Sequence, residues 1–167
     1  MVDFLSDGTP ILLRPIEPGD KARLSLALGR LSQETIRKRF FAAKPRFTSS
    51  ELRYLTEVDG HNHIALVAVL PEDPDSIVGV ARCVRLSDPD LAEFAIVVGD
   101  PYQGRGLGTL LARELARAAR AAGIRRFAAT TLGDNDAARR LMRTITAHLE
   151  VDRIDHGVRE VVVDLAA

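Results

Sequence analysis

The sequence predicts an α+β fold in which a mostly antiparallel sheet is flanked by helices. Three strand-like runs, residues 64–70, 77–86 and 91–98, follow one another with short turn segments between them, as in an antiparallel meander. Residues 106–123 then repeat Leu and Ala at helical spacing. Another short strand, 127–131, comes after that helix. This strand–helix–strand unit predicts one parallel pair joined by a right-handed crossover.

One strand, two short helices and a further helical turn or two are predicted before the meander. Residues 11–14 form an apolar run that Pro15 ends, which indicates the first strand. Residue types that favour a helix N-cap then recur at Asp20, at Ser32 and at Thr48 or Ser49. The helices predicted from the first two caps cover residues 20–31 and 33–42, and a helical turn or two through Leu52 and Leu55 follows the third.

The end of the chain predicts one more helix and two more strands. Gly123 is suited to stop the long helix, and Asp134 and Asn135 offer N-caps for the next helix, which runs to about residue 145. Residues 148–154 and 159–165 then read as two strands joined by a turn. In total we expect seven strands and about four helices, in one domain covering residues 1–167.

The composition limits the classes of function. Lys plus Arg number 23 and Asp plus Glu number 23, so the net charge is zero, which does not favour a general nucleic-acid binder. The lone Cys83 cannot form an intramolecular disulfide. No apolar run reaches the roughly 18 residues of a membrane span, and the four His residues show no metal-ligand spacing. We expect a cytoplasmic protein without nucleic acid, membrane or metal as partner.

The zero net charge conceals an uneven distribution along the chain. Residues 51–102 carry 3 basic and 10 acidic side chains, a net charge of −7. Residues 103–146 carry 9 basic and 3 acidic side chains, a net charge of +6. The basic segment predicts attraction of a phosphate-bearing ligand, although the preference for Arg over Lys can reflect genome composition alone.

The segment 100–109 carries the strongest chemical signal. It lies between a predicted strand and the long helix, and its glycines at 104, 106 and 108 let the backbone approach a ligand closely. A helix N-terminus favours an anion. The segment lacks the Gly-Lys-Ser/Thr of a P-loop and the G-x-G-x-x-G of a dinucleotide site. The glycines and the helix N-terminus together predict a phosphate or pyrophosphate cradle of another kind, to which Arg105 could add a charged contact.

The remaining pattern is Gln103-x-x-Gly106-x-Gly108, and with it the sequence resembles the GNAT superfamily of acyl-CoA-dependent N-acyltransferases. The order of elements agrees along nearly the whole chain, as do the strand at 91–98 and the segment from Asp134 to Leu141. The resemblance implies a GNAT-like fold with acetyl-CoA as cosubstrate. It also implies direct transfer of the acetyl group from the thioester to an amine.

The resemblance implies two kinds of contact with the cosubstrate. Loop N–H groups grip the CoA pyrophosphate, while the preceding strand and the start of the last helix lie beside the pantetheine arm. That strand and the one at 127–131 are expected to splay apart. The residues so implied are Ile96, Val98, Gln103, Gly104, Arg105, Gly106, Gly108, Thr109, Asn135 and Ala138. Asn135 has a compatible second role as a helix N-cap.

Glu93 is the candidate general base. A lysine amine is mostly protonated near neutral pH, so a base must remove a proton before the amine can attack. Glu93 lies in an otherwise apolar strand, where burial would raise its pKa and improve it as a base. The alternative is a glutamate on the sheet face paired with Arg82 or Arg85. Many family members place a Tyr acid where this chain has Met142.

The resemblance also implies an acceptor pocket built from the first helices, where Arg39, Phe40 and Phe41 are the candidate binding residues. The segment 34–41 and the Ala92-Glu93 pair resemble the acetyltransferase domain of bacterial protein lysine acetyltransferases, which implies a protein lysine as acceptor. The same segment also reads as an amphipathic helix whose Phe residues enter the core while its Arg residues face solvent. A small-molecule amine acceptor and a non-catalytic acyl-CoA-binding module are the alternative functions. The choice between monomer and homodimer stays open.

Overall fold

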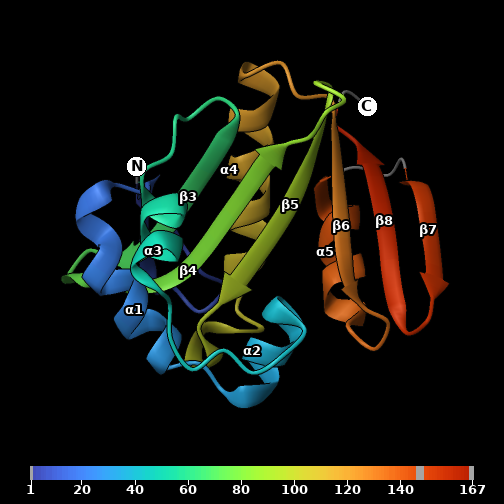
Figure 1. Cartoon of the computed structure of the whole chain (residues 1–167). Helices are drawn as coiled ribbons and strands as arrows, with labels where there is room; N and C mark the ends of the chain where they lie inside the picture. Colours follow the sequence, from blue (N-terminus) through green and yellow to red (C-terminus); the bar gives the residue numbers. More distant parts are fainter. Residues whose placement is uncertain (1, 146–148, 166–167) are drawn as a thin grey trace.

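The computed structural model describes residues 2–145 and 149–165. Eight strands form one sheet in the order β1-β2-β3-β4-β5-β6-β8-β7 (Figure 1). The strands are β1 (Val2–Phe4), β2 (Pro10–Pro15), β3 (His63–Leu70), β4 (Asp73–Arg85), β5 (Leu91–Val98), β6 (Arg126–Leu132), β7 (Leu149–Asp155) and β8 (Val158–Asp164). The helices are α1 (Lys21–Gly29), α2 (Gln33–Phe40), α3 (Ser49–Thr56), α4 (Leu107–Ala121) and α5 (Asp136–Ile145), with 3-10 turns η1 (Pro18–Asp20) and η2 (Asp100–Tyr102).

The predicted α+β class and the mixed sheet are confirmed. Strands β1 to β5 form an antiparallel ladder, and β5 pairs with β6 in parallel through the crossover helix α4. The sheet has eight strands where seven are predicted, because β1 pairs with β2. With three residues, β1 is too short to show an alternating pattern in the sequence. The described residues form five α-helices, against about four predicted.

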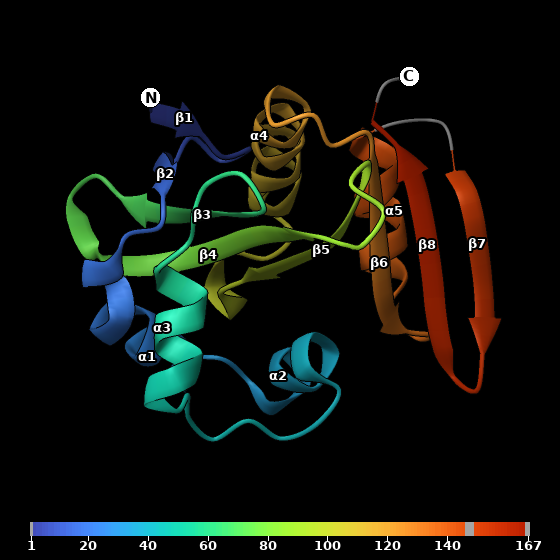
Figure 2. The same ribbon diagram turned by 45° about the horizontal axis from the view of Figure 1, so that its top comes forward.

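Helices cover both faces of the sheet. Figure 2 shows α4 on one side of the strands and α1 and α3 on the other. The α4 side holds the larger core, in which Leu107, Leu111 and Phe127 are fully buried. A Cβ at Gly79 of β4 would lie 2.9 Å from the Leu111 side chain, so α4 packs directly on the backbone of β4. The other core lies between the sheet and helices α1 and α3.

Local capping signals explain where the N-terminal helices begin. The Ser32 hydroxyl accepts from the Thr35 N–H, and the Thr48 hydroxyl accepts from the Glu51 N–H. Both predicted caps are confirmed. Asp20 is not a side-chain cap for α1. It ends the turn η1, so its carboxylate faces back and accepts from the Glu17 N–H at 2.8 Å.

Strands β5 and β6 pair over a short stretch only. The register contains Leu91↔Arg126, Ala92↔Phe127 and Glu93↔Ala128 and then ends. Beyond these residues the two strands diverge, while β6 keeps its pairing with β8 to its end (Figure 1). The predicted splay is therefore present. Helix α2 contacts both β5 and β6 and lies near their carboxyl ends (Figure 1).

Membrane insertion finds no support among the described helices. None of those in residues 2–145 and 149–165 is long and apolar enough to cross a bilayer.

Candidate functional site

The loop between β5 and α4 presents backbone donors at a helix N-terminus. Gly104 and Gly106 have φ values of +70° and +91°, the left-handed region that favours glycine. Gly106 is the N-cap of the 15-residue helix α4. The N–H groups of Leu107, Gly108 and Thr109 lie in the first turn, where no helix carbonyl precedes them as acceptor. This arrangement suits an anion with several oxygens.

The side chains of Gln103 and Arg105 brace this loop. Arg105 donates to Asp7 Oδ2 at 2.7 Å and to Thr9 Oγ1 at 2.6 Å, which fastens the β1–β2 turn to the loop. Gln103 Nε2 donates to the Val98 carbonyl at 3.0 Å and to Thr35 Oγ1 at 3.2 Å. The expected phosphate contact from the Arg105 guanidinium is not prepared in this arrangement, because that group is already bonded. The loop offers its backbone N–H groups instead.

The other residues implied for the cosubstrate lie around the divergence of β5 and β6. Ile96 and Val98 on β5 are partly buried and pack on the α4-side core. A Cβ at Gly108 would lie 3.7 Å from side-chain atoms of both Val98 and Leu141, so β5, α4 and α5 meet there. Asn135 and Ala138 lie at the start of α5. Asn135 Oδ1 accepts from the Ala138 N–H at 3.4 Å, which is its N-cap role.

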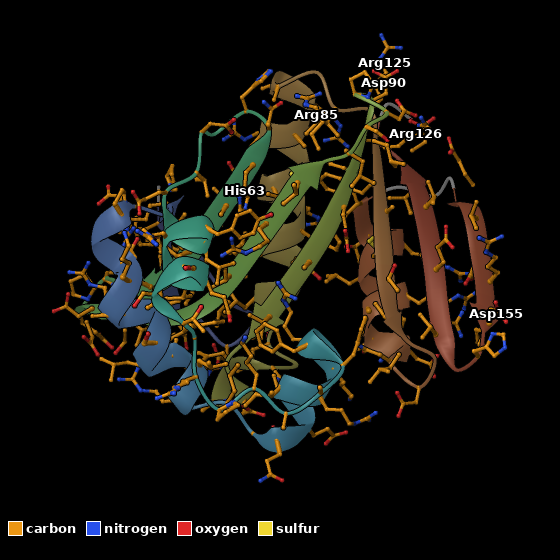
Figure 3. All side chains as sticks on the ribbon, in the orientation of Figure 1. His63, Arg85, Asp90, Arg125, Arg126 and Asp155 are labelled. Carbon is orange, nitrogen blue, oxygen red and sulfur yellow. The ribbon has the colours of Figure 1, made fainter. Side chains whose placement is uncertain are left out.

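Glu93 stands at the last position of β5 that pairs with β6, and it is exposed. The expectation that it is buried is wrong. Side chains alternate along a strand, and Ala92 and Phe94 point into the α4-side core, so Glu93 points to the opposite face. The alternative partners are also engaged elsewhere. Arg82 donates to the Leu55 carbonyl and to His63, and Arg85 donates to the carbonyls of Pro89 and Ala122. Figure 3 shows Arg85 at the end of the sheet away from α2.

The three implied acceptor residues lie at the end of α2. Phe40 packs edge-on against Phe47, with ring centroids 6.0 Å apart. Phe41 ends the helix with φ at +63° and is exposed. Arg39 is half-buried; burial lowers its pKa, and the charge of Glu93 opposes that effect. The amphipathic reading of this segment is therefore wrong for Arg39 and Phe41, since the exposed one is the phenylalanine.

Polar contacts fasten α2 to both sides of the site. The Asp100 carboxylate accepts from the Ser32 N–H at 2.9 Å, from its hydroxyl at 2.7 Å and from the Thr35 hydroxyl at 2.8 Å. Arg37 pairs with Asp134, just before α5, at 3.0 Å. In the sequence, Asp100 is only the first residue of the glycine-rich segment 100–109. Its partners lie 65 and 68 residues away, so no local signal could reveal them.

A second polar cluster lies on the sheet face covered by α3. Arg82 is 7% exposed, and its Nη1 donates to the Leu55 carbonyl at 3.1 Å and to His63 Nε2 at 3.0 Å. Figure 3 shows His63 on β3 beside α3. Burial lowers the pKa of His63 to about 4, so its ring is neutral at pH 7 and can accept from Arg82. The sequence contains no signal for this cluster, because each residue stands alone in an apolar strand.

Two neighbouring cavities open on the same face. The larger, of about 410 Å³, lies between α1, the α2–α3 connection, the β3–β4 hairpin and η2. The smaller, of about 40 Å³, includes Arg39 and Arg82 in its wall. Five residues line both cavities: Leu24, Phe40, Phe47, Val80 and Val97. The larger volume falls within the range of about 300–1,000 Å³ that is usual for small-molecule sites.

Metal and thiol chemistry find little support in the described part of the chain. No group of three or more His, Cys, Asp or Glu side chains there is arranged to hold a metal ion. Cys83 is buried, and burial raises the pKa of its thiol to about 12. A thiol with this pKa is a poor nucleophile near neutral pH.

Sequence comparisons place this chain among acetyltransferases. The model of the acetyltransferase (GNAT) family matches residues 32–145. Acetyltransferase Pat of Mycolicibacterium smegmatis is 39% identical over 137 residues, which cover 81% of this chain and 40% of that protein. Acetyltransferase PA5475 of Pseudomonas aeruginosa is 32% identical over 149 residues, which cover 89% of this chain and 78% of that protein. The chain thus spans less than half the length of the mycobacterial relative.

Comparisons with solved structures agree with the family match. The GNAT domain of S. lividans PAT superposes with a TM-score of 0.88 at 29% identity, covering 99% of this chain and 96% of that one. The structure of yncA from Salmonella typhimurium, solved with its cofactor acetyl-CoA, superposes with a TM-score of 0.71 at 16% identity, covering 93% and 94%. At that identity, the second comparison supports the fold alone.

Proposed function

This chain belongs to the GNAT acetyltransferase family, and we propose that it is an acetyl-CoA-dependent N-acetyltransferase acting on a primary amine. The observation that carries the proposal is the glycine loop, which places the N-terminus of α4 beside Val98 of β5, on the stretch of that strand that no longer pairs with β6. The proposal treats residues 1–167 as a single N-acetyltransferase domain. It also includes a cytoplasmic location, because the one cysteine leaves the fold independent of disulfides.

In this proposal the loop holds the CoA pyrophosphate through backbone N–H groups from Gln103 to Thr109. The positive end of the α4 dipole adds to the attraction of the phosphates. Ile96 and Val98 offer their backbone groups to the pantetheine arm, because β5 has no partner strand on that side beyond Glu93. Asn135 and Ala138 flank the arm from the start of α5. Gly108 leaves room where these elements meet.

Glu93 is proposed as the base that removes the amine proton, directly or through a water molecule. Bound acetyl-CoA supplies an activated acetyl group as a thioester. Transfer forms the amide C–N bond and breaks the thioester C–S bond, so a thiolate leaves. Met142 is 1% exposed and has no proton to give. A thiolate is a good leaving group, so transfer does not need the tyrosine acid of other family members.

Glu93→Gln tests this role. We expect kcat to fall by about 10²-fold or more, the usual contribution of a general base, while calorimetry shows unchanged CoA affinity. The wild-type rate should rise with pH as the acceptor amine loses its proton. A variant with the wild-type rate and pH profile rejects Glu93 as base. A wild-type protein that binds CoA tightly but acetylates no amine would instead be an acyl-CoA-binding module.

The acceptor is proposed in two classes. A protein lysine is the first candidate, which rests on the likeness of the segment 34–41 to bacterial protein lysine acetyltransferases. A small-molecule amine is the second candidate, and the cavity of about 410 Å³ beside α2 favours it. Intact-mass measurements on candidate proteins, run beside a panel of free amines, separate the two classes.

A further inference from the structure

Two arginines share the small cavity on the face of the sheet that α1 and α3 cover. Arg82 comes from β4 and is buried, whereas Arg39 comes from α2 and is half-buried. They are close enough to repel one another. Burial and the charge of Arg39 together lower the pKa of Arg82 to about 10. Within the described residues, neither guanidinium forms an ion pair with a carboxylate.

Elsewhere the protein compensates a buried charge. The carboxylate of Asp20 is 0% exposed, and Arg14 donates to its two oxygens at 2.8 and 2.7 Å. Arg23 adds a third contact at 3.2 Å. Such pairing is the general pattern, because an unpaired buried charge costs several kcal/mol. Arg39 and Arg82 depart from this pattern, which indicates that an external anion completes the site.

Hydrogen-bond donors for that anion are present. The contacts of Arg82 to Leu55 and His63 use Nη1 alone and hold its guanidinium in place. Arg39 makes no hydrogen bond to any described residue, and its guanidinium lies 4.9 Å from the centre of the Phe40 ring. Guanidinium donors match the planar, two-oxygen geometry of a carboxylate.

The cavities restrict the size and polarity of the anion. The smaller cavity, of about 40 Å³, is little larger than the volume of about 30 Å³ that one water molecule occupies. It can hold a small head group, while the rest of the ligand must extend into the cavity of about 410 Å³. The shared wall is apolar, formed by leucine, phenylalanine and valine side chains. An organic carboxylate with an apolar body fits this division better than inorganic phosphate.

Glu93 supplies the complementary charge. Its carboxylate is near enough for its charge to act on Arg39, yet too far for an ion pair. A molecule whose carboxylate meets Arg39 and Arg82 could therefore present an ammonium group to Glu93. The two ends of an amino acid carry these charges.

We propose that the acceptor is a small amine that also carries a carboxylate, such as an apolar amino acid, and that Arg39 and Arg82 bind the carboxylate. This inference rests on the proposed N-acetyltransferase function and names the acceptor class for the same site.

The test compares three acceptors that differ in one group: phenylalanine, phenylalaninamide and phenethylamine. We expect the wild-type kcat/KM to be about 10- to 100-fold higher for phenylalanine, the range of a charged hydrogen-bonded contact. Arg39→Met should raise the KM for phenylalanine by about tenfold or more and leave the other two acceptors and CoA affinity unchanged. Arg39→Lys should restore part of the loss. Lys38→Gln, one residue away and paired with Glu34, is the matched control and should change nothing.

Equal rates for the three acceptors, an equal effect of Arg39→Met on all of them, or acetylation of protein lysines alone would overturn the inference. A separate binding experiment keeps it distinguishable from the proposed function. Calorimetry with 3-phenylpropionate, which has no amine to acetylate, should show binding that Arg39→Met abolishes and that 3-phenylpropanamide does not reproduce. This result would support the carboxylate site even if no amine were acetylated. Equal binding by acid and amide would reject it.

Discussion

Single residues show how burial sets the chemistry of charged groups in this protein. Asp20 sits without solvent contact between Arg14 and Arg23. Burial acts to raise the pKa of Asp20, but hydrogen bonds from Arg14 and from the Glu17 N–H outweigh it and lower the pKa overall. The carboxylate therefore stabilises the folded chain in its charged form.

Asp20→Asn should lower the free energy of unfolding by about 3 kcal/mol, because it breaks a buried ion pair. Urea unfolding measures the loss. Asp75→Asn is the control: Asp75 also pairs with Arg23, but its side chain is 75% exposed, so the change should stay below about 1 kcal/mol. Equal effects of the two substitutions would contradict the assignment.

The same residue predicts a pH dependence of stability. A carboxyl with a lowered folded pKa contributes stability above its unfolded pKa of about 3.9 and loses it as pH falls through the folded value. The difference in unfolding free energy between wild type and Asp20→Asn should therefore be constant near neutral pH and shrink below about pH 4. A difference that persists at acid pH would be at odds with this account.

Cys83 gives a prediction about reactivity. It is 0% exposed, and burial raises the pKa of its thiol to about 12. Because the thiolate is the reactive form, an aromatic disulfide reagent at pH 8 should not modify the native protein. It should react once urea unfolds the chain. Fast modification of the folded protein would show that the thiol is accessible.

At the scale of elements, α2 depends on polar contacts for its position. None of its residues is buried. Its first turn is held by Asp100 and Gln103 from the loop before α4, and Arg37 ties it to the start of α5. The helix that carries Arg39 is therefore fastened to the same loop that we propose holds the CoA pyrophosphate. Binding at the loop should steady the acceptor side.

Asp100→Ala should release the first turn of α2, because it removes three hydrogen bonds from Ser32 and Thr35. We expect hydrogen exchange of the α2 amides to speed up about tenfold, which corresponds to a net loss of about 1.4 kcal/mol in the free energy of local opening. Asp134→Ala breaks only the exposed pair with Arg37 and should have a smaller effect. Unchanged α2 exchange in Asp100→Ala would mean that packing holds the helix.

Elements with local signals could be predicted from the sequence, and those with distant partners could not. Ser32 and Thr48 cap helices through contacts three residues away, and β5 has the predicted bounds. The contact between Arg105 and Asp7 spans 98 residues, so the sequence offers no sign that this arginine is engaged. The burial of Glu93 is wrongly predicted for a related reason. Its strand is apolar on both faces, and only the packing of α2 and α3 shows which positions stay uncovered.

At the scale of the whole molecule, the uneven charge along the sequence is partly evened out in space. Three arginines of the basic segment 103–146 pair with acids outside it: Arg105 with Asp7, Arg126 with Asp88 and Arg139 with Asp152. Attraction of a phosphate ligand therefore rests on the N–H groups of the glycine loop more than on these arginines. Arg140 and Arg143 are exposed and stay candidates for a supporting role.

Gly106→Ala separates the role of the loop in CoA binding from its contribution to global stability. The substitution forces a side chain into the left-handed region and should cost about 1–2 kcal/mol of unfolding free energy. It should also weaken CoA binding by calorimetry about tenfold or more, because the N–H groups no longer converge, and so reduce the rise in Tm that CoA produces. Gly60→Ala, with a similar φ of +72° in a distant turn, is the control. It should lose similar stability and keep full CoA affinity.

The early end of pairing between β5 and β6 creates a pair of edges inside the sheet. An edge at the rim of a sheet can recruit a strand from any passing chain, which is one origin of aggregation. These inner edges face each other, with α2 near their open end and α4 and α5 behind them. A ligand that hydrogen-bonds to either inner edge has to lie along the strands. The break therefore favours a slender molecule with amide groups of its own and disfavours a polypeptide strand with side chains on both faces.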